Sequence, residues 1–232
     1  MAGSRVYDPY PEGSQPPYRS ERYGRTAAMG PDSIQAPLRT STELSGPVFQ
    51  PLDDKNRDLV HENGGVAVGS LMRLVVRVLD EDARPQRNSL VEIWQANAAG
   101  KYQHPQDDRD APLDKHFRTW GRAVTDENGE VDFLTIRPGA YPVPNGTGWW
   151  RPPHIHISAY GDAFASRIIT QMYFPGDPLN DIDGILQGIP DASARDSLIL
   201  KPDSDVGLFE QALGFRFDMV LRGRAETPTE AR

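Results

Sequence analysis

The chain has 232 residues, carries a formal net charge of −8 and contains no cysteine. The lack of cysteine excludes disulfides, thiolate metal sites and a cysteine nucleophile, and the acidic balance argues against a nucleic-acid partner. A hydrophobic content of 38% is enough for one substantial core. The first twenty residues contain no apolar run and no later segment reaches membrane-spanning length, so we expect a cytoplasmic protein with no membrane partner.

Residues 1–51 are polar and proline-rich, without a sustained hydrophobic period. Such a segment has too few apolar residues to fold alone. It is either a flexible tail or an arm that packs on a partner chain or over a site. We expect an interface-forming arm over residues 1–51 and one globular domain over residues 52–232. The tyrosines that could anchor the arm through their amphipathic rings are Tyr7, Tyr10, Tyr18 and Tyr23.

Apolar and β-branched runs predict about seven strands in the globular domain. Residues 119–125 and 130–136 read as a β-hairpin, because Asn-Gly at 128–129 is a turn signal. Residues 178–205 are irregular, with room for one short helix. Neither a long helical period nor an internal repeat is present, so we expect an all-β fold, a β-sandwich with long loops. The other predicted strands cover residues 71–79, 89–96, 154–158, 166–174 and 215–222.

The stretch 149–158 has the strongest chemical pattern. Its second half alternates apolar and polar residues with period two, which predicts a strand. Side chains two positions apart on a strand share a face, at a spacing of roughly 6.6 Å. His154 and His156 can therefore converge on one metal while Ile155 and Ile157 face a core. The two prolines before His154 keep the approach extended. Two histidines that line a polar face without a metal are the alternative.

Two histidines do not complete a metal site. A zinc hydrolase would usually add a third histidine or a carboxylate, and a non-haem Fe(II) oxygenase adds one carboxylate. Tyr102 and Tyr141 lie in loops that flank the histidine strand, and a phenolate oxygen is a hard anionic donor suited to Fe(III). Spacing alone does not decide between metal ligation and ordinary packing for either tyrosine. Solvated or structural roles are expected for the remaining histidines, which are His61, His104 and His116.

Several short motifs follow one another in a fixed order. Together they resemble the intradiol ring-cleavage dioxygenases over roughly residues 46–223. Within that family, Trp-Gln-Ala-Asn at 94–97 resembles the protocatechuate 3,4-dioxygenases, and in particular their iron-bearing β chain. Catechol 1,2-dioxygenases usually have histidine after that tryptophan. The motifs that carry the resemblance are residues 91–98, 100–102, 141–142, 150–156, 169–174, 176–178, 215–218 and 220–223.

The resemblance implies a catalytic domain that binds one Fe(III) per chain. Its ligands would be Tyr102, Tyr141, His154 and His156, with Tyr141 and His156 axial and the other two equatorial. It also implies an activity: cleavage of protocatechuate, or a related 4-substituted catechol, between its two hydroxyls with O2 to a substituted cis,cis-muconate. On substrate binding, Tyr141 would leave the iron and take up one of the two catechol protons.

Further roles follow from the same resemblance. Arg151 matches the catalytic arginine of the family, whose fixed charge would stabilise negative charge that builds on the substrate. Gln171 matches a glutamine near the site and Ile185 a residue beside the substrate ring; plain packing is the alternative for both. Trp94 is expected to support Tyr102 from behind.

One position departs from the pattern. Protocatechuate dioxygenases have tryptophan two residues after the axial tyrosine, where this chain has Val143. That position lines the substrate pocket in the family, so another acidic catechol, such as 4-sulfocatechol, is open as a substrate. Tyr18 loosely matches the family tyrosine that meets the acidic group of the substrate, with Tyr23 as the competing match.

The resemblance also implies a partner chain. In protocatechuate dioxygenases a homologous α chain packs with the β chain around a shared pocket, so we expect a hetero-oligomer in which residues 1–51 order against an α chain. A non-catalytic sandwich subunit is the alternative from a different class, because the α chain of the family keeps the fold without an iron site. The presence of both tyrosines, both histidines and Arg151 in one chain argues against that alternative.

Overall fold

The computed structural model describes residues 54–104, 107–143, 149–161, 167–208 and 211–229. The arm expected at residues 1–51 lies outside the described residues, and so do Tyr18 and Tyr23. In the described part, the strands are β1 (Leu71–Leu79), β2 (Leu90–Trp94), β3 (Trp120–Val124), β4 (Glu130–Ile136), β5 (Tyr141–Pro142), β6 (Trp150–Arg151), β7 (His154–Tyr160), β8 (Arg167–Tyr173), β9 (Lys201–Pro202) and β10 (Leu213–Val220). The helices are η2 (Asp54–Arg57), η3 (Pro178–Ile182) and α3 (Ala192–Ser197).

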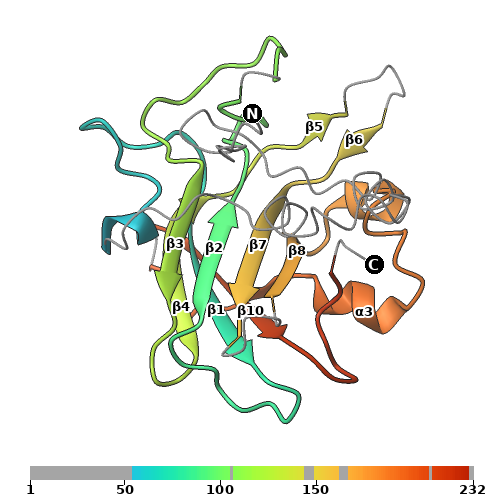
Figure 1. Ribbon diagram of the computed structural model, residues 1–232. Helices are drawn as coiled ribbons and strands as arrows, with labels where there is room; N and C mark the ends of the chain where they lie inside the picture. Colours follow the sequence, from blue (N-terminus) through green and yellow to red (C-terminus); the bar gives the residue numbers. More distant parts are fainter. Residues whose placement is uncertain (1–53, 105–106, 144–148, 162–166, 209–210, 230–232) are drawn as a thin grey trace, which may run out of the picture.

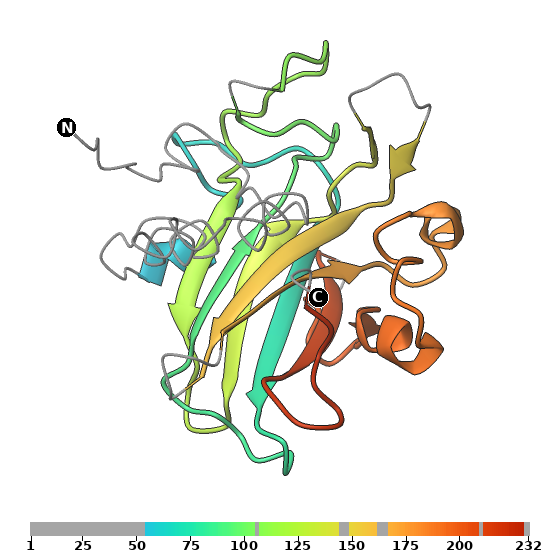
Figure 2. The ribbon, with the colours of Figure 1, turned by 45° about the vertical axis from the view of Figure 1, so that its right-hand side comes forward.

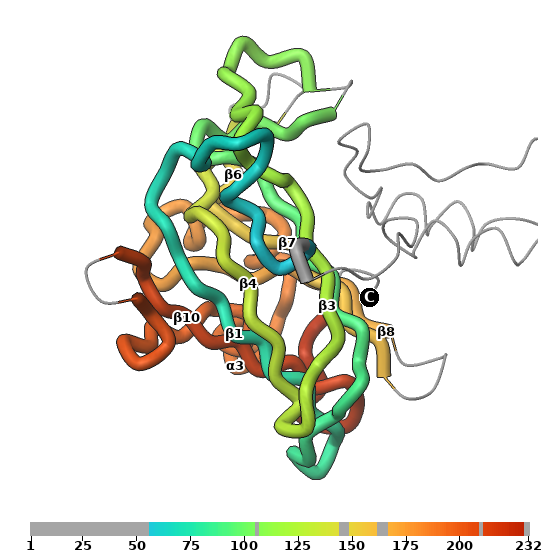
Figure 3. The backbone as a smooth tube through the Cα atoms, turned by 90° about the vertical axis from the view of Figure 1, so that its left-hand side faces the viewer, coloured from blue at the N-terminus to red at the C-terminus, as the bar shows by residue number. Residues whose placement is uncertain are grey.

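The described residues form two four-stranded sheets, and a two-stranded ribbon extends from one end (Figure 1). One sheet has the order β4-β1-β10-β9 and the other β3-β2-β7-β8, while β5 and β6 form the ribbon. Figure 3 shows the two sheets as separate layers. The pairing of β1 with β10 is parallel, and the other strand pairs in the sheets are antiparallel. The expected β-sandwich is confirmed.

The core between the layers follows from the alternation along the strands. In β10, Phe215, Phe217 and Met219 are buried while the residues between them are partly exposed. From the opposite layer, Ile155 and Ile157 of β7 are fully buried in the same cluster. Burial of each such side chain contributes roughly 1.5–3 kcal/mol. This packing fixes which face of β7 points into the core and therefore which face carries the histidines.

The predicted hairpin of residues 119–125 and 130–136 is wrong, although both strands form. β3 pairs with β2 in one sheet, and β4 pairs with β1 in the other. The turn itself has the expected chemistry: Gly129 has φ +71°, and the Asp126 carboxylate accepts two backbone hydrogen bonds. The turn residues determine the local backbone only. Because the chain crosses from one layer to the other at this turn, each strand pairs within its own layer.

The segment predicted to be irregular between residues 178 and 205 contains the expected short helix, α3, and in addition η3 and the two-residue strand β9. The Asp191 carboxylate caps α3 by accepting hydrogen bonds from the backbone N–H groups of Ser193 and Ala194. In Figure 2 this segment, in orange, lies below the β5–β6 ribbon, in yellow. Across the residues that the structure describes, no helix has the length and apolar character needed to cross a membrane.

Candidate metal centre

The two histidines of β7 lie side by side on the face of the sheet that points away from the core. His154 is 1% exposed and His156 is 0% exposed, and their ring centroids are 4.9 Å apart. In the sheet register, His156 lies between Trp94 of β2 and Gln171 of β8. The prediction of a strand that carries both histidines on one face is therefore confirmed.

Both imidazoles are suited to act as neutral donors. Burial lowers the pKa of His154 and of His156 well below the usual value, and the nearby Arg151 charge lowers both further. Nδ1 of His154 lies 2.7 Å from the carbonyl oxygen of Pro152. Because a carbonyl only accepts, Nδ1 carries the proton and Nε2 keeps its lone pair, which is the tautomer that a metal ligand needs.

The two tyrosines come to the cluster from two different segments. Tyr141 forms β5 and pairs with Arg151 of β6, so the ribbon that leads into β7 also positions this ring. Its hydroxyl lies 3.2 Å from Nε2 of His154. Tyr102 follows the turn after β2, where Gly100 has φ +71°, and its ring meets that of Tyr141 edge-on with centroids 5.5 Å apart. Both tyrosines are buried. Four donor side chains from three segments therefore form one cluster.

Trp94 stacks on His156 rather than on Tyr102. The two ring planes differ by 2° and the centroids are 5.1 Å apart. Tyr102 instead packs in a small cluster with Ala96 and Tyr141. The expectation that Trp94 supports Tyr102 is corrected to this extent: the ring that Trp94 holds in place is the imidazole opposite it in the sheet.

Arg151 lies beside this cluster in a dense polar network. Its Nη2 donates to Oε1 of Gln171 and, at 3.3 Å, to the hydroxyl of Tyr173. Its Nε and Nη2 also contact the carboxylate of Asp183, at 3.1 and 3.2 Å. Arg151 and Gln171, both singled out from the sequence, are therefore in direct contact. Asp183 was missed, because it lies in an irregular segment where no hydrophobic period distinguishes one aspartate from another.

The structure describes two of the three expected substrate contacts. Ile185 is half-buried, and its N–H donates to Oδ1 of Asp183 at 3.2 Å, which links it to Arg151 through the carboxylate. Val143 follows β5 and extends the ribbon by donating its N–H to the Trp149 carbonyl at 2.8 Å. Tyr18 lies outside the described residues, so its contact with substrate stays a prediction.

Two of the other histidines have structural roles, as expected. Nδ1 of His61 lies 2.7 Å from a carboxylate oxygen of Asp58 at the surface. Nδ1 of His116 lies 2.9 Å from the carbonyl oxygen of Glu62. The His116 ring also fills the space where a Cβ on Gly65 would stand. Neither histidine belongs to the buried cluster.

The donor set fits a hard, highly charged metal ion. In the described part of the chain, no three or more histidine, cysteine, aspartate and glutamate side chains form a group that could hold a metal. The phenol of Tyr141 meets His154, which meets His156, and the phenol of Tyr102 joins the cluster through Tyr141. A trivalent cation can hold a phenol deprotonated far below its usual pKa, so two phenolates and two neutral imidazoles are a donor set suited to Fe(III).

Comparison with known proteins places the chain among the dioxygenases, enzymes of the oxidoreductase class. Residues 44–223 match the family model described as Dioxygenase. The chain is 47% identical over 222 residues to the protocatechuate 3,4-dioxygenase beta chain of Burkholderia cepacia, an alignment that covers 94% of each. It is 31% identical over 163 residues to the protocatechuate 3,4-dioxygenase alpha chain of Pseudomonas putida, covering 69% of this chain and 76% of that one.

Solved structures agree with the fold. The dioxygenase domain of a fusion protein from Streptomyces sp. SirexAA-E is 26% identical, with a TM-score of 0.52, and the match covers 76% of this chain and 94% of that one. The chain belongs to the intradiol dioxygenase family, as the ordered motifs indicated. Members of this family depend on iron.

Proposed function

We propose that this chain is the iron-bearing subunit of an Fe(III)-dependent intradiol dioxygenase. It would cleave protocatechuate, or another acidic 4-substituted catechol, with O2 between the two hydroxyls to give a substituted cis,cis-muconate. The observation that carries the proposal is the meeting of Tyr102, Tyr141, His154 and His156 in one buried cluster. The identity of 47% to a chain named as a protocatechuate 3,4-dioxygenase beta chain supports the choice of substrate.

The four side chains of the cluster would hold one iron per chain. Bound Fe(III) supplies a Lewis acid that draws electron density from the catechol ring and so opens it to O2. Tyr141 Oη accepts one of the two catechol protons when substrate binds. His154 is already oriented for ligation, because the Pro152 carbonyl holds its Nδ1 proton. The Trp94 ring stacks on the His156 imidazole and so restricts its rotation.

Arg151 supplies a fixed positive charge next to the reacting ring. Gln171 and Asp183 hold its guanidinium from two sides, so the charge does not have to reorganise during the reaction. A preorganised donor of this kind acts on charge that develops in the transition state. Ile185, held through Asp183, would pack beside the substrate ring.

Val143 favours a second acidic substrate, 4-sulfocatechol. Valine is much smaller than the tryptophan expected at this position, which leaves more room close to Tyr141 for a bulky ring substituent. Tyr18, from the arm, would meet the acidic group of either substrate. Both candidates keep the catechol hydroxyls, so the chemistry at the tyrosines and histidines is the same.

A homologous α chain is the proposed partner. The relative from Pseudomonas putida bears that name and is 31% identical to this chain over 163 residues, so the two partners would have the same fold. Trp150, next to Arg151 on β6, is 47% exposed, and so large an apolar ring at the surface fits an interface. Expression of the chain alone and with candidate α chains tests this. An isolated chain that is monodisperse, iron-loaded and as active as the mixture would argue against a shared pocket.

The function is tested with purified protein reconstituted with iron and supplied with a panel of 4-substituted catechols. We expect a red-brown protein, because tyrosinate-to-Fe(III) charge transfer absorbs visible light. We also expect O2 uptake with protocatechuate or 4-sulfocatechol and a product opened between the hydroxyls. Protein loaded with zinc is the matched control and should be colourless and inactive. A colourless iron protein, or ring opening outside the two hydroxyls, would refute the proposal.

A further inference from the structure

The segments that carry the two tyrosines lie against each other backbone to backbone. A Cβ on Gly100, just before Tyr102, would stand 2.3 Å from the carbonyl oxygen of Ala140, just before Tyr141. Gly139 is equally close to the first segment, where a Cβ would stand 2.4 Å from a carbonyl oxygen. Side chains at these two positions would push the segments apart. The glycines therefore determine how closely the tyrosines approach.

Asp107 holds the Tyr102 segment through its carboxylate. Its Oδ2 accepts the Tyr102 N–H at 3.0 Å, and its Oδ1 lies 3.2 Å from Nζ of Lys101. The side chains of Asp107 and Lys101 are each 9% exposed, so salt screens this ion pair much less than a surface pair. Lys101 Nζ also donates to the carbonyl of Arg109 at 2.6 Å. These contacts fix the backbone on which Arg109 stands.

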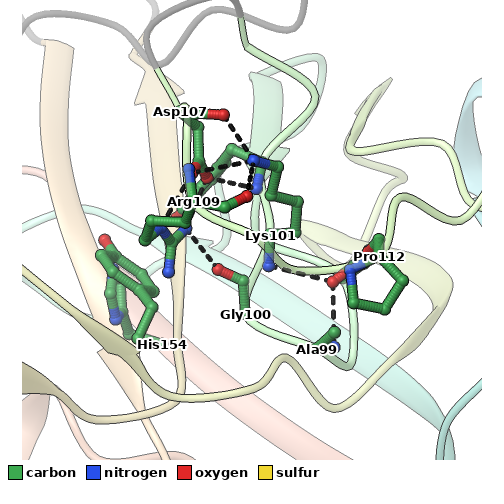
Figure 4. Close-up of polar contacts among 10 residues, drawn as sticks. Ala99, Gly100, Lys101, Asp107, Arg109, Pro112 and His154 are labelled. Carbon is green, nitrogen blue, oxygen red and sulfur yellow. Dashed lines mark hydrogen bonds and ion pairs between the residues drawn. The ribbon is translucent and has the colours of Figure 1, made fainter.

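Arg109 connects the two tyrosine segments. Its Nε donates to Oδ1 of Asp107 at 2.8 Å, and its Nη2 donates to the Gly100 carbonyl at 2.6 Å and also to the Asp107 carboxylate. Figure 4 shows these bonds, with His154 in the same close-up. The guanidinium carbon of Arg109 stands over the ring of Tyr141, 4.9 Å from its centroid. One side chain thus binds the Tyr102 segment through its edge and the Tyr141 ring through its face.

We propose that Arg109 is a positioning residue that sets where the Tyr141 ring lies relative to Tyr102 and His154. The proposal rests on the proposed function, in which these three side chains hold the iron. The Tyr141 hydroxyl is 3.2 Å from Nε2 of His154, so a shifted ring changes the spacing of the donors. Lysine cannot replace the arginine fully, because only a planar guanidinium combines a donor fork with a stacking face.

The test compares Arg109→Gln and Arg109→Lys with Arg137→Gln. Arg137 is a matched control, since it pairs with Asp177 at 3.0 Å and stands over the Phe174 ring at 5.0 Å, outside the tyrosine cluster. Iron-free protein labelled with 3-fluorotyrosine reports the Tyr141 ring by fluorine NMR, with the resonance assigned from Tyr141→Phe. Iron-loaded protein reports the position of the charge-transfer band, the iron content, kcat and KM.

We expect the Tyr141 resonance and the band to move in both Arg109 variants and to stay unchanged in Arg137→Gln. kcat should fall about 10- to 10²-fold in Arg109→Gln, because a small misplacement of reacting groups lowers the rate by about this factor. The change in KM should be smaller, and the loss of kcat should be smaller in Arg109→Lys. If Arg109→Gln does not fold, Arg109→Lys decides. An unmoved resonance with an unmoved band overturns the proposal, as does an equal effect in Arg137→Gln. If the wild-type protein has no band, the proposed function fails, while the iron-free NMR still decides the role of Arg109.

Discussion

Arg151 and Asp183 form a bidentate ion pair beside the cluster of tyrosines and histidines. Nε of Arg151 lies 3.1 Å from Oδ1 and Nη2 lies 3.2 Å from Oδ2, and the two side chains are 3% and 0% exposed. Arg151 comes from the ribbon that carries Tyr141, whereas Asp183 follows η3. The pair therefore ties the irregular segment to the ribbon and holds the arginine in one orientation.

Removal of the arginine should affect turnover far more than iron binding. We expect Arg151→Ala to lower kcat by about 10²–10³, the usual effect of removing one preorganised electrostatic donor. Iron content and the charge-transfer band should stay close to wild type, because Arg151 is not one of the four donors. Arg151→Lys keeps the charge but loses the planar guanidinium. Its kcat should therefore lie between those of the wild type and Arg151→Ala. Turnover is measured per bound iron at saturating catechol, and a wild-type rate in Arg151→Ala would leave the residue a structural one.

Removal of the Asp183 carboxylate should lower the stability of the fold. Asp183→Ala leaves the Arg151 charge buried without its counter-ion, which typically lowers the free energy of unfolding by about 3–5 kcal/mol. In the double variant Arg151→Ala/Asp183→Ala neither charge is left behind, so its loss should be smaller than the sum of the two single losses. Urea unfolding of all four proteins measures this cycle. Strictly additive losses would mean that the ion pair contributes nothing.

Removal of one phenol oxygen should disturb the metal centre while leaving the fold intact. Tyr102→Phe keeps a ring that packs edge-on against Tyr141 but removes the hydroxyl. We expect it to lose most of the charge-transfer absorption or to fail to hold iron. Tyr160→Phe is the control, since Tyr160 lies at the end of β7, the strand that carries the two histidines, and is not one of the four donors. Visible spectra and iron content decide; a Tyr102→Phe spectrum identical to wild type contradicts the ligand assignment.

Local pattern predicted the histidines but could not predict the residues that join them. His154 and His156 share a face because of strand geometry alone, and the buried Ile155 and Ile157 fix which face it is. Spacing did not indicate that the loops of Tyr102 and Tyr141 meet. Their meeting depends on close backbone contacts between distant segments, and only the likeness to a family made it predictable. Asp183 and Arg109 act through tertiary contacts that no sequence period records.

Single strands were predicted well, because the pattern of their own residues determines them. Strand pairing was predicted poorly where the chain crosses from one sheet to the other. An apolar, partly alternating run predicted β1, in which both faces hold buried residues, and clean alternation predicted β10, which has one buried face. The Asn-Gly turn before β4 specified its own backbone but not the partners of the strands that it joins. The stacking partner of Trp94 was also missed, since it depends on the register between β2 and β7.

A buried carboxyl on β2 predicts an unusual dependence of stability on pH. Glu92 is fully buried, with Oε2 3.3 Å from Nη2 of Arg167 and 3.5 Å from Oγ of Ser158. Burial raises the pKa of Glu92 to about 7, against the attraction of Arg167 and Arg122, which lowers it. The short ion-pair distance favours an ionised carboxylate, whereas burial favours a neutral one. We take burial to dominate, because the group is shielded from water on every side.

The sign of the effect follows from the two states. The ordinary pKa of a glutamate, 4.5, applies to the unfolded chain, so the native state binds this proton more tightly. The stability that the proton contributes is fully present below pH 4.5 and is lost as pH rises through about 7. A shift of this size corresponds to at most about 3 kcal/mol. Carboxyls with a lowered pKa, such as Asp203 with its hydrogen bond from Arg216, act in the opposite sense at lower pH.

Glu92→Gln separates the buried group from these others. Glutamine keeps the shape and cannot ionise, so the variant should lack the loss of stability between about pH 4.5 and 7 that Glu92 causes in the wild-type protein. The free energy of unfolding from urea titrations across this range is compared between the two proteins. We expect their difference to change with pH in favour of the variant, by up to about 3 kcal/mol. A difference that stays constant across the range would show that Glu92 is ionised throughout and that its two arginines outweigh burial.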